Sequence, residues 1–294
     1  MTIHVLGSVN IDYVYRVPNL PQPGETLAGL SRAVHLGGKG ANQAIAAARA
    51  GAPVRFIGAI GPGDDWTRDR LAAAGVDVSC VAEVEEATGH AIIYVDAAGE
   101  NCIVIHGGAN RAIPEAVVEA ALAQAQAGDW WLTQNETSGV TEAAARAQSR
   151  GLRTVHVAAP FVPEDALPVL PHTDLLAVNE GEAAALASRL GGAVPVDVML
   201  VTRGAAGAAW RERPTVPDGA GELSVPAFAV TAVDTTGAGD CFLGYALAGL
   251  HAGLTPEVAL RRAAAAAALS VTREGAADAI PEAAEVDAFL AERS

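Results

Sequence analysis

The stretch Asp234-Thr-Thr-Gly-Ala-Gly-Asp240 runs directly into the apolar segment Cys241-Phe-Leu-Gly-Tyr-Ala-Leu-Ala-Gly-Leu250. A glycine-rich turn that opens a helix gathers backbone N–H groups at the positive end of the helix dipole, so it can bind an anion. Asp240 adds a fixed negative charge beside that position, which suits a base that takes a proton from a hydroxyl attacking a phosphate. The alternative is an ordinary helix cap, because aspartate is a preferred N-cap residue. The stretch alone leaves both interpretations open.

The rest of the chain alternates short apolar runs with longer helical segments, which is the order of βαβ units and of a mostly parallel sheet. The expected strands are residues 3–6, 54–60, 130–133, 154–158, 175–179 and 198–202, with a hairpin arm at 208–211. The expected helices are residues 41–50, 67–74, 114–127, 141–150 and 180–190, and most of 241–272. The pattern therefore predicts an α/β fold.

Two segments break this alternation. Residues 11–33 are rich in proline and glycine, and the β-branched runs 90–96 and 101–106 are joined by the turn Ala97-Ala-Gly-Glu100, which indicates a hairpin. Because no helices flank these pieces, they predict a small sheet outside the main body that could act as a lid. An edge hairpin without functional motion is the alternative.

Composition excludes several classes of function. The 294 residues carry 19 Lys and Arg against 34 Asp and Glu, a formal charge of −15, which argues against a nucleic-acid or acidic-membrane binder. Cys80, Cys102 and Cys241 are scattered without metal-ligand spacing. The N-terminus has no basic, apolar leader, and no apolar run reaches membrane-spanning length. We therefore expect a cytoplasmic protein.

A second glycine-rich turn, Gly37-Gly-Lys-Gly-Ala-Asn-Gln43, precedes an expected helix. It matches neither the P-loop nor the dinucleotide pattern. Asn42 offers both a donor and an acceptor, which suits a sugar hydroxyl. Asn10 and Asp12 lie two apart, so they share a side of an extended segment and could bind adjacent hydroxyls. A plain helix start and an Asx turn are the structural alternatives.

Three more candidate groups also come just after expected strands. Asn179 and Glu182 lie three apart at a helix start, so they form either a capping box or a Mg²⁺ site. The turn Thr202-Arg-Gly-Ala-Ala-Gly207 suits nucleotide phosphates or a simple hairpin, and Glu136 ends a short polar run after a strand. Because α/β enzymes assemble their sites at the carboxyl ends of strands, this shared placement favours a catalytic site.

In this order the motifs resemble the ribokinase family of carbohydrate kinases, the PfkB type. Gly37-Gly-Lys-Gly-Ala-Asn-Gln43 resembles the N-terminal signature of the family and Asp234-Thr-Thr-Gly-Ala-Gly-Asp240 the C-terminal one, and the resemblance extends from Gly7 to near Pro281. Lys39, the pair Asn10 and Asp12, and Gly107-Gly-Ala-Asn110 point to the ribose-specific members. The resemblance implies one catalytic domain over residues 1–294, a three-layer α/β/α sandwich with a small β-sheet lid at about 11–36 and 88–107.

The resemblance also implies a function for each matched residue. Asp240 would be the catalytic base, and Gly237, Ala238 and Gly239 the anion hole for the transferring phosphoryl group. The residues that would bind ribose are Asn10, Asp12, Gly38, Lys39, Asn42 and Glu136, together with Asp240. The residues that would bind ATP and Mg²⁺ are Asn179, Glu182, Thr202, Arg203, Gly204, Gly207 and Gly239, with Glu182 reaching Mg²⁺ through water. The ligands of an activating K⁺ would be Asp234, Thr236, Ser270, Arg273 and Gly275.

Two departures from the family pattern accompany these matches. Ala279 occupies a place where these kinases often carry a serine that completes the K⁺ site, so one oxygen ligand is missing. The segment 187–198 is too short for the helix that usually precedes the nucleotide loop.

The sequence thus predicts ATP-dependent phosphorylation of the O5 hydroxyl of D-ribose to ribose 5-phosphate, in a homodimer formed through the lid. The alternatives are a deoxyribose, fructose or nucleoside kinase of the same class, or a sugar-binding sensor that lacks catalysis. An oxidoreductase is disfavoured because the dinucleotide fingerprint is missing.

Overall fold

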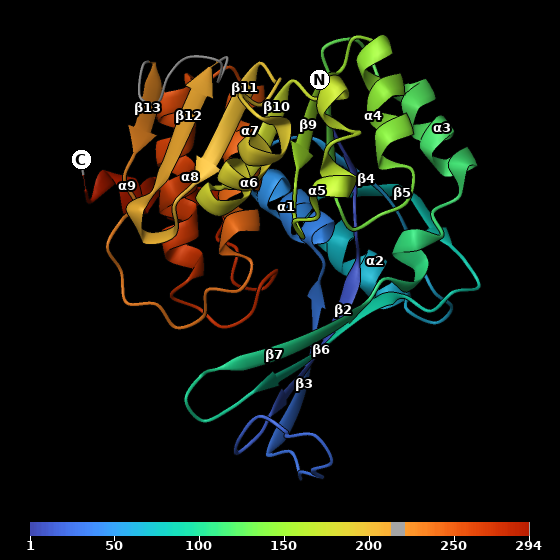
Figure 1. The fold of residues 1–294 in the computed structure, drawn as a ribbon, viewed down its shortest axis with the longest axis vertical. Helices are drawn as coiled ribbons and strands as arrows, with labels where there is room; N and C mark the ends of the chain where they lie inside the picture. The colour runs from blue at the N-terminus through green and yellow to red at the C-terminus, as the bar shows by residue number, and fades with distance from the viewer. Residues whose placement is uncertain (213–220, 294) are drawn as a thin grey trace.

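The computed structural model describes residues 1–212 and 221–293 of the chain (Figure 1). Its main body is built on a nine-stranded sheet with the order β13-β12-β11-β10-β9-β8-β1-β4-β5. Seven strands are parallel: β1 (Ile3–Leu6), β4 (Val54–Ile60), β5 (Asp77–Glu83), β8 (Trp130–Gln134), β9 (Arg153–Val157), β10 (Leu175–Asn179) and β11 (Val198–Thr202). Two antiparallel strands, β12 (Ala208–Glu212) and β13 (Glu222–Val225), extend one edge. The predicted mostly parallel α/β sheet is confirmed.

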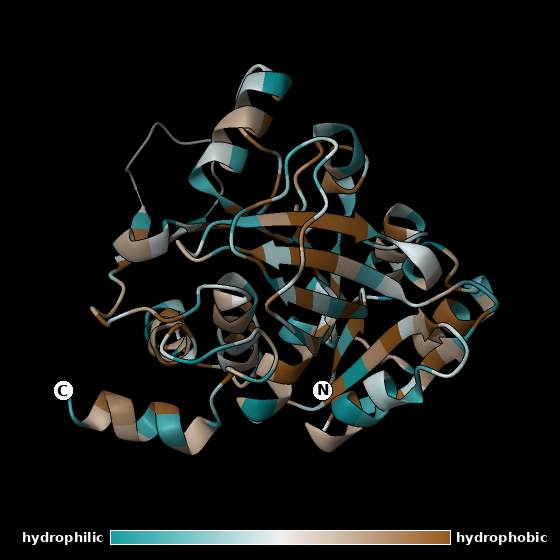
Figure 2. Ribbon diagram, turned by 90° about the horizontal axis from the view of Figure 1, so that it is seen from below, coloured by the Kyte–Doolittle hydropathy of each residue, from teal (hydrophilic) through white to brown (hydrophobic). Residues whose placement is uncertain are grey.

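Helices cover both faces of this sheet. One face packs against α1 (Lys39–Arg49), α2 (Asp65–Ala73), α7 (Ala238–His251), α8 (Pro256–Ser270) and α9 (Ala283–Ala291). The other face packs against α3 (Glu115–Gln124), α4 (Val140–Ser149), α5 (Pro163–Ala166) and α6 (Glu180–Leu190). Successive residues of β1 point to opposite faces of the sheet, and both faces are apolar. Ile3 and Val5 pack in the hydrophobic cluster beneath α1 and α7, whereas Leu6 packs in the cluster beneath α3 and α4. The hydrophobic residues lie along the central strands (Figure 2).

A four-stranded sheet with the order β3-β2-β6-β7 projects from the main body (Figure 1). Its strands are β2 (Asn10–Arg16), β3 (Ser31–Gly37), β6 (Gly89–Val95) and β7 (Asn101–His106). The predicted small sheet is therefore confirmed. No helix covers β7 within the described residues, and all six of its residues are exposed.

Several elements were not predicted from the sequence. β5 reads Asp-Val-Ser-Cys-Val-Ala-Glu, and only Cys80 and Val81 of this edge strand are buried, so its apolar signal is weak. The helix α9 follows Pro281 and begins with a capping box between Glu282 and Glu285. Between α6 and β11 the chain forms no helix, as expected from the short segment, and Val194 and Val196 fill the core there.

None of the helices in the described part of the chain is long and apolar enough to cross a membrane.

Candidate functional site: a carboxylate between a polar cluster and an apolar cavity

Asp240 lies in the first turn of α7. The N-cap of that helix is Gly237, which has φ 72° and ψ 2°, a left-handed conformation that favours glycine. A Cβ at this position would also lie 2.9 Å from Cβ of Ala276. Because the N-cap is Gly237 and the Asp240 carboxylate bonds to side chains of α1 instead, the cap interpretation is wrong for this residue. The turn and the helix start expected from the sequence are both present.

Two amide side chains of α1 hold the Asp240 carboxylate. Asn42 Nδ2 donates to Oδ2 at 3.1 Å and Gln43 Nε2 donates to Oδ1 at 2.8 Å. α1 can approach α7 this closely because Gly244 lies at their crossing, where a Cβ would stand 2.4 Å from Cβ of Ala46. Asn42 was predicted from the sequence to lie at the site, whereas Gln43 was not predicted.

Burial raises the pKa of Asp240 above its ordinary value. The positive charge of Lys39 and the two amide donors act in the opposite direction, and the charge of Glu136 adds to the rise. The carboxylate thus faces two charged side chains, one from α1 and one from the segment after β8. A carboxylate with a raised pKa is a stronger base than an exposed one.

Glu136 is held at the junction of three segments. Its carboxylate accepts a hydrogen bond from the backbone N–H of Lys39 at 3.2 Å and another from the Ser8 hydroxyl. The turn after β1 and the start of α1 are in direct backbone contact there, since a Cβ on Gly40 would lie 2.5 Å from Cα of Gly7. Gly38, the N-cap of α1, and Lys39 are therefore placed beside Glu136, as the sequence predicted for a common polar site.

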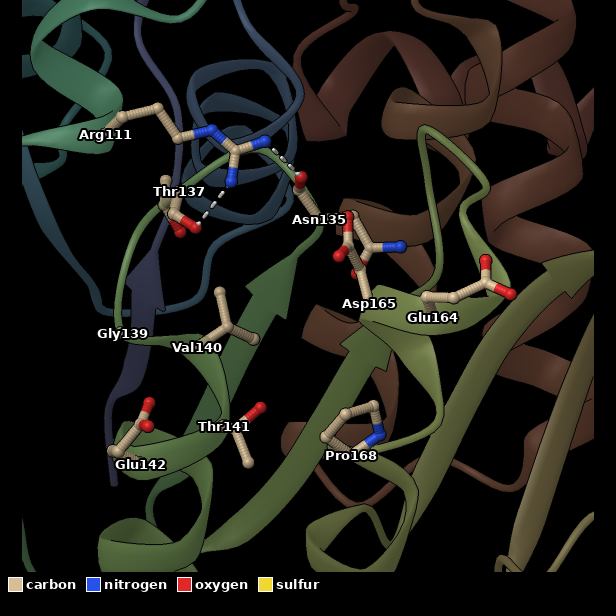
Figure 3. A pocket seen from close by; sticks show the side chains of 10 residues that line it. All are labelled: Arg111, Asn135, Thr137, Gly139, Val140, Thr141, Glu142, Glu164, Asp165 and Pro168. Carbon is tan, nitrogen blue, oxygen red and sulfur yellow. Dashed lines mark hydrogen bonds between the residues drawn. The ribbon is translucent and has the colours of Figure 1, made fainter.

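Arg111 anchors the backbone on both sides of Glu136. Its Nη1 donates to the carbonyl of Thr137 and its Nη2 to the carbonyl of Asn135, both at 3.1 Å (Figure 3). Asn135 Nδ2 in turn donates to the carbonyl of Pro160 at 3.1 Å. A pocket of about 230 Å³ opens on this side of the segment. Arg111 was not predicted from the sequence, because its partners are backbone carbonyls.

Asn10 and Asp12 lie on one side of β2, as their spacing predicted. Asn110 Nδ2 donates to Asn10 Oδ1 at 2.8 Å, and Asn110 Oδ1 accepts from the N–H of Val9 at 2.9 Å. Burial and the nearby charge of Glu136 raise the pKa of Asp12 to about 6, although His35 partly opposes this. Asn42 Oδ1 is buried without a partner in the described structure, so it is free to accept a hydrogen bond from a ligand.

A cavity of about 560 Å³ lies on the other side of the α7 start. It is lined by Thr202, Gly204 and Gly207 of the loop after β11, by Ala238 and Gly239, and by apolar side chains such as Phe228 and Val271. The predicted nucleotide loop and the predicted anion hole therefore share one cavity. Its apolar lining suits a flat aromatic base.

The guanidinium of Arg203, in contrast, forms ion pairs with two carboxylates. Its Nε lies 3.0 Å from Glu180 Oε1, and its Nη1 lies 2.9 Å from Glu222 Oε1. Hydrogen bonds from Arg203 and Arg211 lower the pKa of Glu222 to about 2, although burial opposes this shift. The guanidinium would have to leave these partners to reach a phosphate.

Asn179 and Glu182 form the capping box that was one of their two interpretations. Asn179 Oδ1 accepts from the N–H of Glu182 at 2.9 Å, and Glu182 Oε2 accepts from the N–H of Asn179 at 2.8 Å. Oε1 of Glu182 has no part in this box. The described residues contain no cluster of three or more His, Cys, Asp or Glu side chains that could hold a metal ion.

The predicted K⁺ ligands are only partly brought together. Asp234 accepts from the N–H of Thr236 at 2.9 Å and of Gly275 at 3.0 Å. Burial of Asp234 works against ionisation, but these hydrogen bonds outweigh it and lower its pKa. The carbonyl of Ser270 accepts from the N–H of Arg273 at 3.1 Å.

The side chains of Arg273 and Ala279 supply no oxygen ligand, so Arg273 would contribute only its carbonyl. The Arg273 side chain pairs with Glu285 at 2.5 Å. Ala279 is 1 % exposed and contributes only a methyl group to the core.

Three comparisons with known proteins agree with this geometry. Residues 2–283 match the model of the pfkB family carbohydrate kinases. The chain is 37% identical to a ribokinase of Haemophilus influenzae over 98% of each chain, and 30% identical to a deoxyribokinase of Salmonella typhi over 99% of each. It resembles the structure of Arabidopsis thaliana ribokinase complexed with ribose and ATP, with a TM-score of 0.84 and 28% identity over 98% of each chain. The chain therefore belongs to the pfkB family of carbohydrate kinases, which are phosphotransferases with an alcohol group as acceptor.

Proposed function

We propose that this kinase transfers the γ-phosphoryl group of ATP to the O5 hydroxyl of D-ribose and forms ribose 5-phosphate. The observation that carries the proposal is the position of Asp240. Its carboxylate is held by Asn42, lies within the electrostatic reach of Glu136, and directly follows Gly239, which lines the apolar cavity. The Haemophilus and Arabidopsis relatives support ribose as the acceptor and ATP as the donor.

In this mechanism the chain positions its substrates and stabilises charge. Asp240 accepts the proton of the O5 hydroxyl while the O5–P bond forms and the bond from phosphorus to the leaving ADP oxygen breaks. The backbone N–H groups at Gly237, Ala238 and Gly239 stabilise the charge on the transferring group, because the N-terminal N–H groups of a helix have no partner within it. Asn10, Asp12, Gly38, Lys39, Asn42 and Glu136 hold the sugar.

Thr202, Arg203, Gly204 and Gly207 would contact the nucleotide. The partnerless Asn42 Oδ1 supports the sugar assignment, because it lies on the residue that also holds Asp240. Asp12 would accept from sugar hydroxyls, and its pKa, raised by burial and by the nearby charge of Glu136, makes the ionised carboxylate a strong acceptor.

The residues fit Mg²⁺ and K⁺ to different degrees. Mg²⁺ keeps several waters and binds substrate phosphates, so the one free oxygen of Glu182 fits a water-mediated contact. Mg²⁺ would neutralise the charge that develops on the phosphates. The ionised Asp234, with the carbonyls of Thr236, Ser270, Arg273 and Gly275, offers oxygen ligands for K⁺, and Ala279 leaves this set one oxygen short.

The four-stranded sheet would act as the lid within a single domain of residues 1–294. Closure would exclude water, which otherwise competes as the phosphoryl acceptor. Ile103, Val104 and Ile105 on its edge strand β7 are 48%, 60% and 55% exposed. Exposed apolar residues on an unpaired edge suit a contact with a second copy of the chain, which supports a homodimer through the lid.

The experiment that tests the assignment of Asp240 is the substitution Asp240→Asn. We expect ribose binding to persist and kcat to fall by about two or more orders of magnitude, the scale of general-base loss. Ribose binding by calorimetry and ADP release by a coupled assay would measure these quantities. Near-normal turnover of this variant would exclude Asp240 as the base.

The acceptor is tested by a turnover panel of ribose, 2-deoxyribose, fructose and adenosine. We expect the highest kcat/KM for ribose. 2-Deoxyribose is the second candidate, because the Salmonella relative is a deoxyribokinase. Absence of turnover with every acceptor would favour a sugar-binding sensor.

A further inference from the structure

A chain of two glutamine side chains leads from the central sheet to Asp240. Gln43 Nε2 donates to Asp240 Oδ1 at 2.8 Å, and Gln134 Nε2 donates to Gln43 Oε1 at 2.8 Å. Gln43 and Gln134 are both 0% exposed. The chain therefore connects the end of β8, through α1, to the first turn of α7 without a contact with solvent.

The carboxylate fixes the direction of this chain. An ionised carboxylate only accepts hydrogen bonds, so Gln43 must turn its NH₂ group toward Asp240 and its oxygen toward β8. Gln134 then has to meet that oxygen with its own NH₂ group. If Gln134 were replaced by an apolar side chain, the Gln43 oxygen would be buried without its donor, which is costly. Gln43 would then be held only at its Asp240 end, and its side chain could shift to reach another donor.

Asn42 cannot replace this chain. It also donates to Asp240, at 3.1 Å, but its Oδ1 has no partner in the described structure and we assign it to the sugar. A sugar that binds Asn42 can shift that side chain. Gln43 and Gln134 are enclosed in protein, so a sugar at the site would not contact either side chain.

We propose that Gln134 and Gln43 form a positioning relay that holds the Asp240 carboxylate in the orientation needed to accept the sugar proton. The inference rests on the proposed function of Asp240 as the base. Neither glutamine contacts substrate in this scheme. Gln43 acts on Asp240 directly, and Gln134 acts only through Gln43.

The relay also influences the protonation of Asp240. A hydrogen bond to the charged form of a carboxylate favours that form, so Gln43 opposes the rise in the Asp240 pKa that burial causes. The other ionisable groups around this carboxylate are Lys39 of α1, Glu136 after β8 and the neighbouring Cys241. None of these is altered by a substitution at Gln43 or Gln134.

The test uses Gln43→Met, Gln134→Met and the double variant in the full chain, with kcat and KM measured from pH 5 to 9. For Gln43→Met we expect kcat to fall about 10- to 100-fold, the value of a hydrogen bond to a charged group. For Gln134→Met we expect a fall of about 2- to 10-fold, the value of a neutral hydrogen bond. KM for ribose and ATP should stay within about twofold, since neither side chain binds substrate.

Two readouts separate positioning from a general structural effect. The acid limb of the kcat profile should move to higher pH in both variants, because removal of a donor to the carboxylate raises its pKa. In the Gln43→Met background, Gln134→Met should cause no further loss of kcat, because its only route to Asp240 is already absent. The control is Thr133→Val, which removes a buried hydroxyl on the same strand that bonds to His156 at 3.0 Å. It should lower Tm but leave kcat and the pH profile unchanged.

Additive losses in the double variant, or an unmoved acid limb in Gln43→Met, would overturn the relay. If the methionine variants fail to fold, Gln134→Glu replaces them. Its protonated carboxyl can still donate to Gln43, so kcat should be close to that of the wild type at low pH and fall below it as pH rises. If the ratio of the Gln134→Glu kcat to the wild-type kcat does not change across that pH range, the relay is also overturned. A wild-type protein without kinase activity on the sugar panel would instead refute the proposed function.

Discussion

Gly244→Ala is expected to reduce turnover far more than it reduces stability. Gly244 lies four residues after Asp240 and therefore on the same face of α7, toward α1. A Cβ there would stand 2.4 Å from Cβ of Ala46, 2.6 Å from the carbonyl oxygen of Gln43 and 2.9 Å from the backbone nitrogen of Ala47. Non-bonded carbons prefer about 3.5–4.0 Å, so α1 and α7 must separate by about 1 Å or more.

The magnitudes follow from this separation. Alanine is better than glycine in a helix by about 1 kcal/mol, but overpacking costs about 1–3 kcal/mol, and here two of the three obstructing atoms are backbone. The net loss of about 1 kcal/mol lowers Tm by about 2–4 °C. The hydrogen bonds from Gln43 at 2.8 Å and Asn42 at 3.1 Å would both be broken by a shift of this size. A misplacement of about 1 Å in a catalytic group can reduce the rate by about 100-fold, so kcat should fall by about 10- to 100-fold.

The matched control for this experiment is Gly249→Ala in the same helix. Its Cβ would lie 3.0 Å from Cβ of Ala259, so the change also crowds a helix contact, but this contact is with α8. Tm by calorimetry and ADP release by a coupled assay should show a small loss of stability in both variants and a loss of kcat in Gly244→Ala alone. If Gly244→Ala keeps wild-type kcat, or if both variants lose it equally, the close helix contact does not position Asp240.

Three further predictions concern charged residues around the site. Arg111→Met leaves two backbone carbonyls beside Glu136 without their donor, so the KM for sugar should rise by about tenfold while the KM for ATP stays unchanged in steady-state assays. The pKa of Asp12 is raised from 3.8 to about 6, so the folded state binds the proton more tightly and stability falls as pH rises through this window. Asp12→Asn should therefore raise Tm at pH 8, have little effect on Tm at pH 4, and weaken sugar binding. The pKa of Glu222 is lowered from 4.5 to about 2, so its ion pairs stabilise the fold above pH 4.5 and lose this effect as pH falls toward 2. Glu222→Gln should lower the free energy of unfolding at pH 7 in urea titrations, and the difference from wild type should shrink across that acid window.

The alternation of apolar and helical segments was sufficient to predict the parallel sheet, because buried parallel strands such as β4 and β10 are continuous apolar runs. Edge strands were harder. β5 buries only Cys80 and Val81 and β13 buries only Val225, and their polar residues hide the pattern. The region of β2 and β3 was placed in the small sheet without strand bounds, since the loop between them is rich in proline and glycine.

The sequence predicted which residues meet where a residue type fits one kind of chemistry and lies in a recognisable motif. Asp240 and Asn42, which hydrogen-bond to each other in the structure, belong to this class. Residues that act through backbone groups or through other side chains carry no such signal. Arg111 contacts carbonyls, and Gln134 contacts another glutamine, so only the fold reveals what they hold. Asn179 and Glu182 show a different difficulty. Their spacing fits both a capping box and a Mg²⁺ site, and the sequence could not separate the two interpretations.

The positions of glycine connect the fold with the chemistry. The sequence linked the glycines of the 234–240 turn to an anion, but two other glycines, one in the turn 37–43 and one inside α7, are needed because helices and backbones touch there. Gly40 lies against Gly7, and Gly244 lies against Ala46 and Gln43. These contacts bring the N-terminus of α1 to β1 and bring α7 to α1, so the polar side chains of three separate segments meet around one carboxylate. Each such contact would be lost by adding a single methyl group, whereas a substitution that merely makes a loop less flexible would leave the distances to Asp240 unchanged. The geometry of Asp240 is therefore set mainly by helix packing, and the turn before it supplies the N–H groups that we propose bind the phosphoryl group.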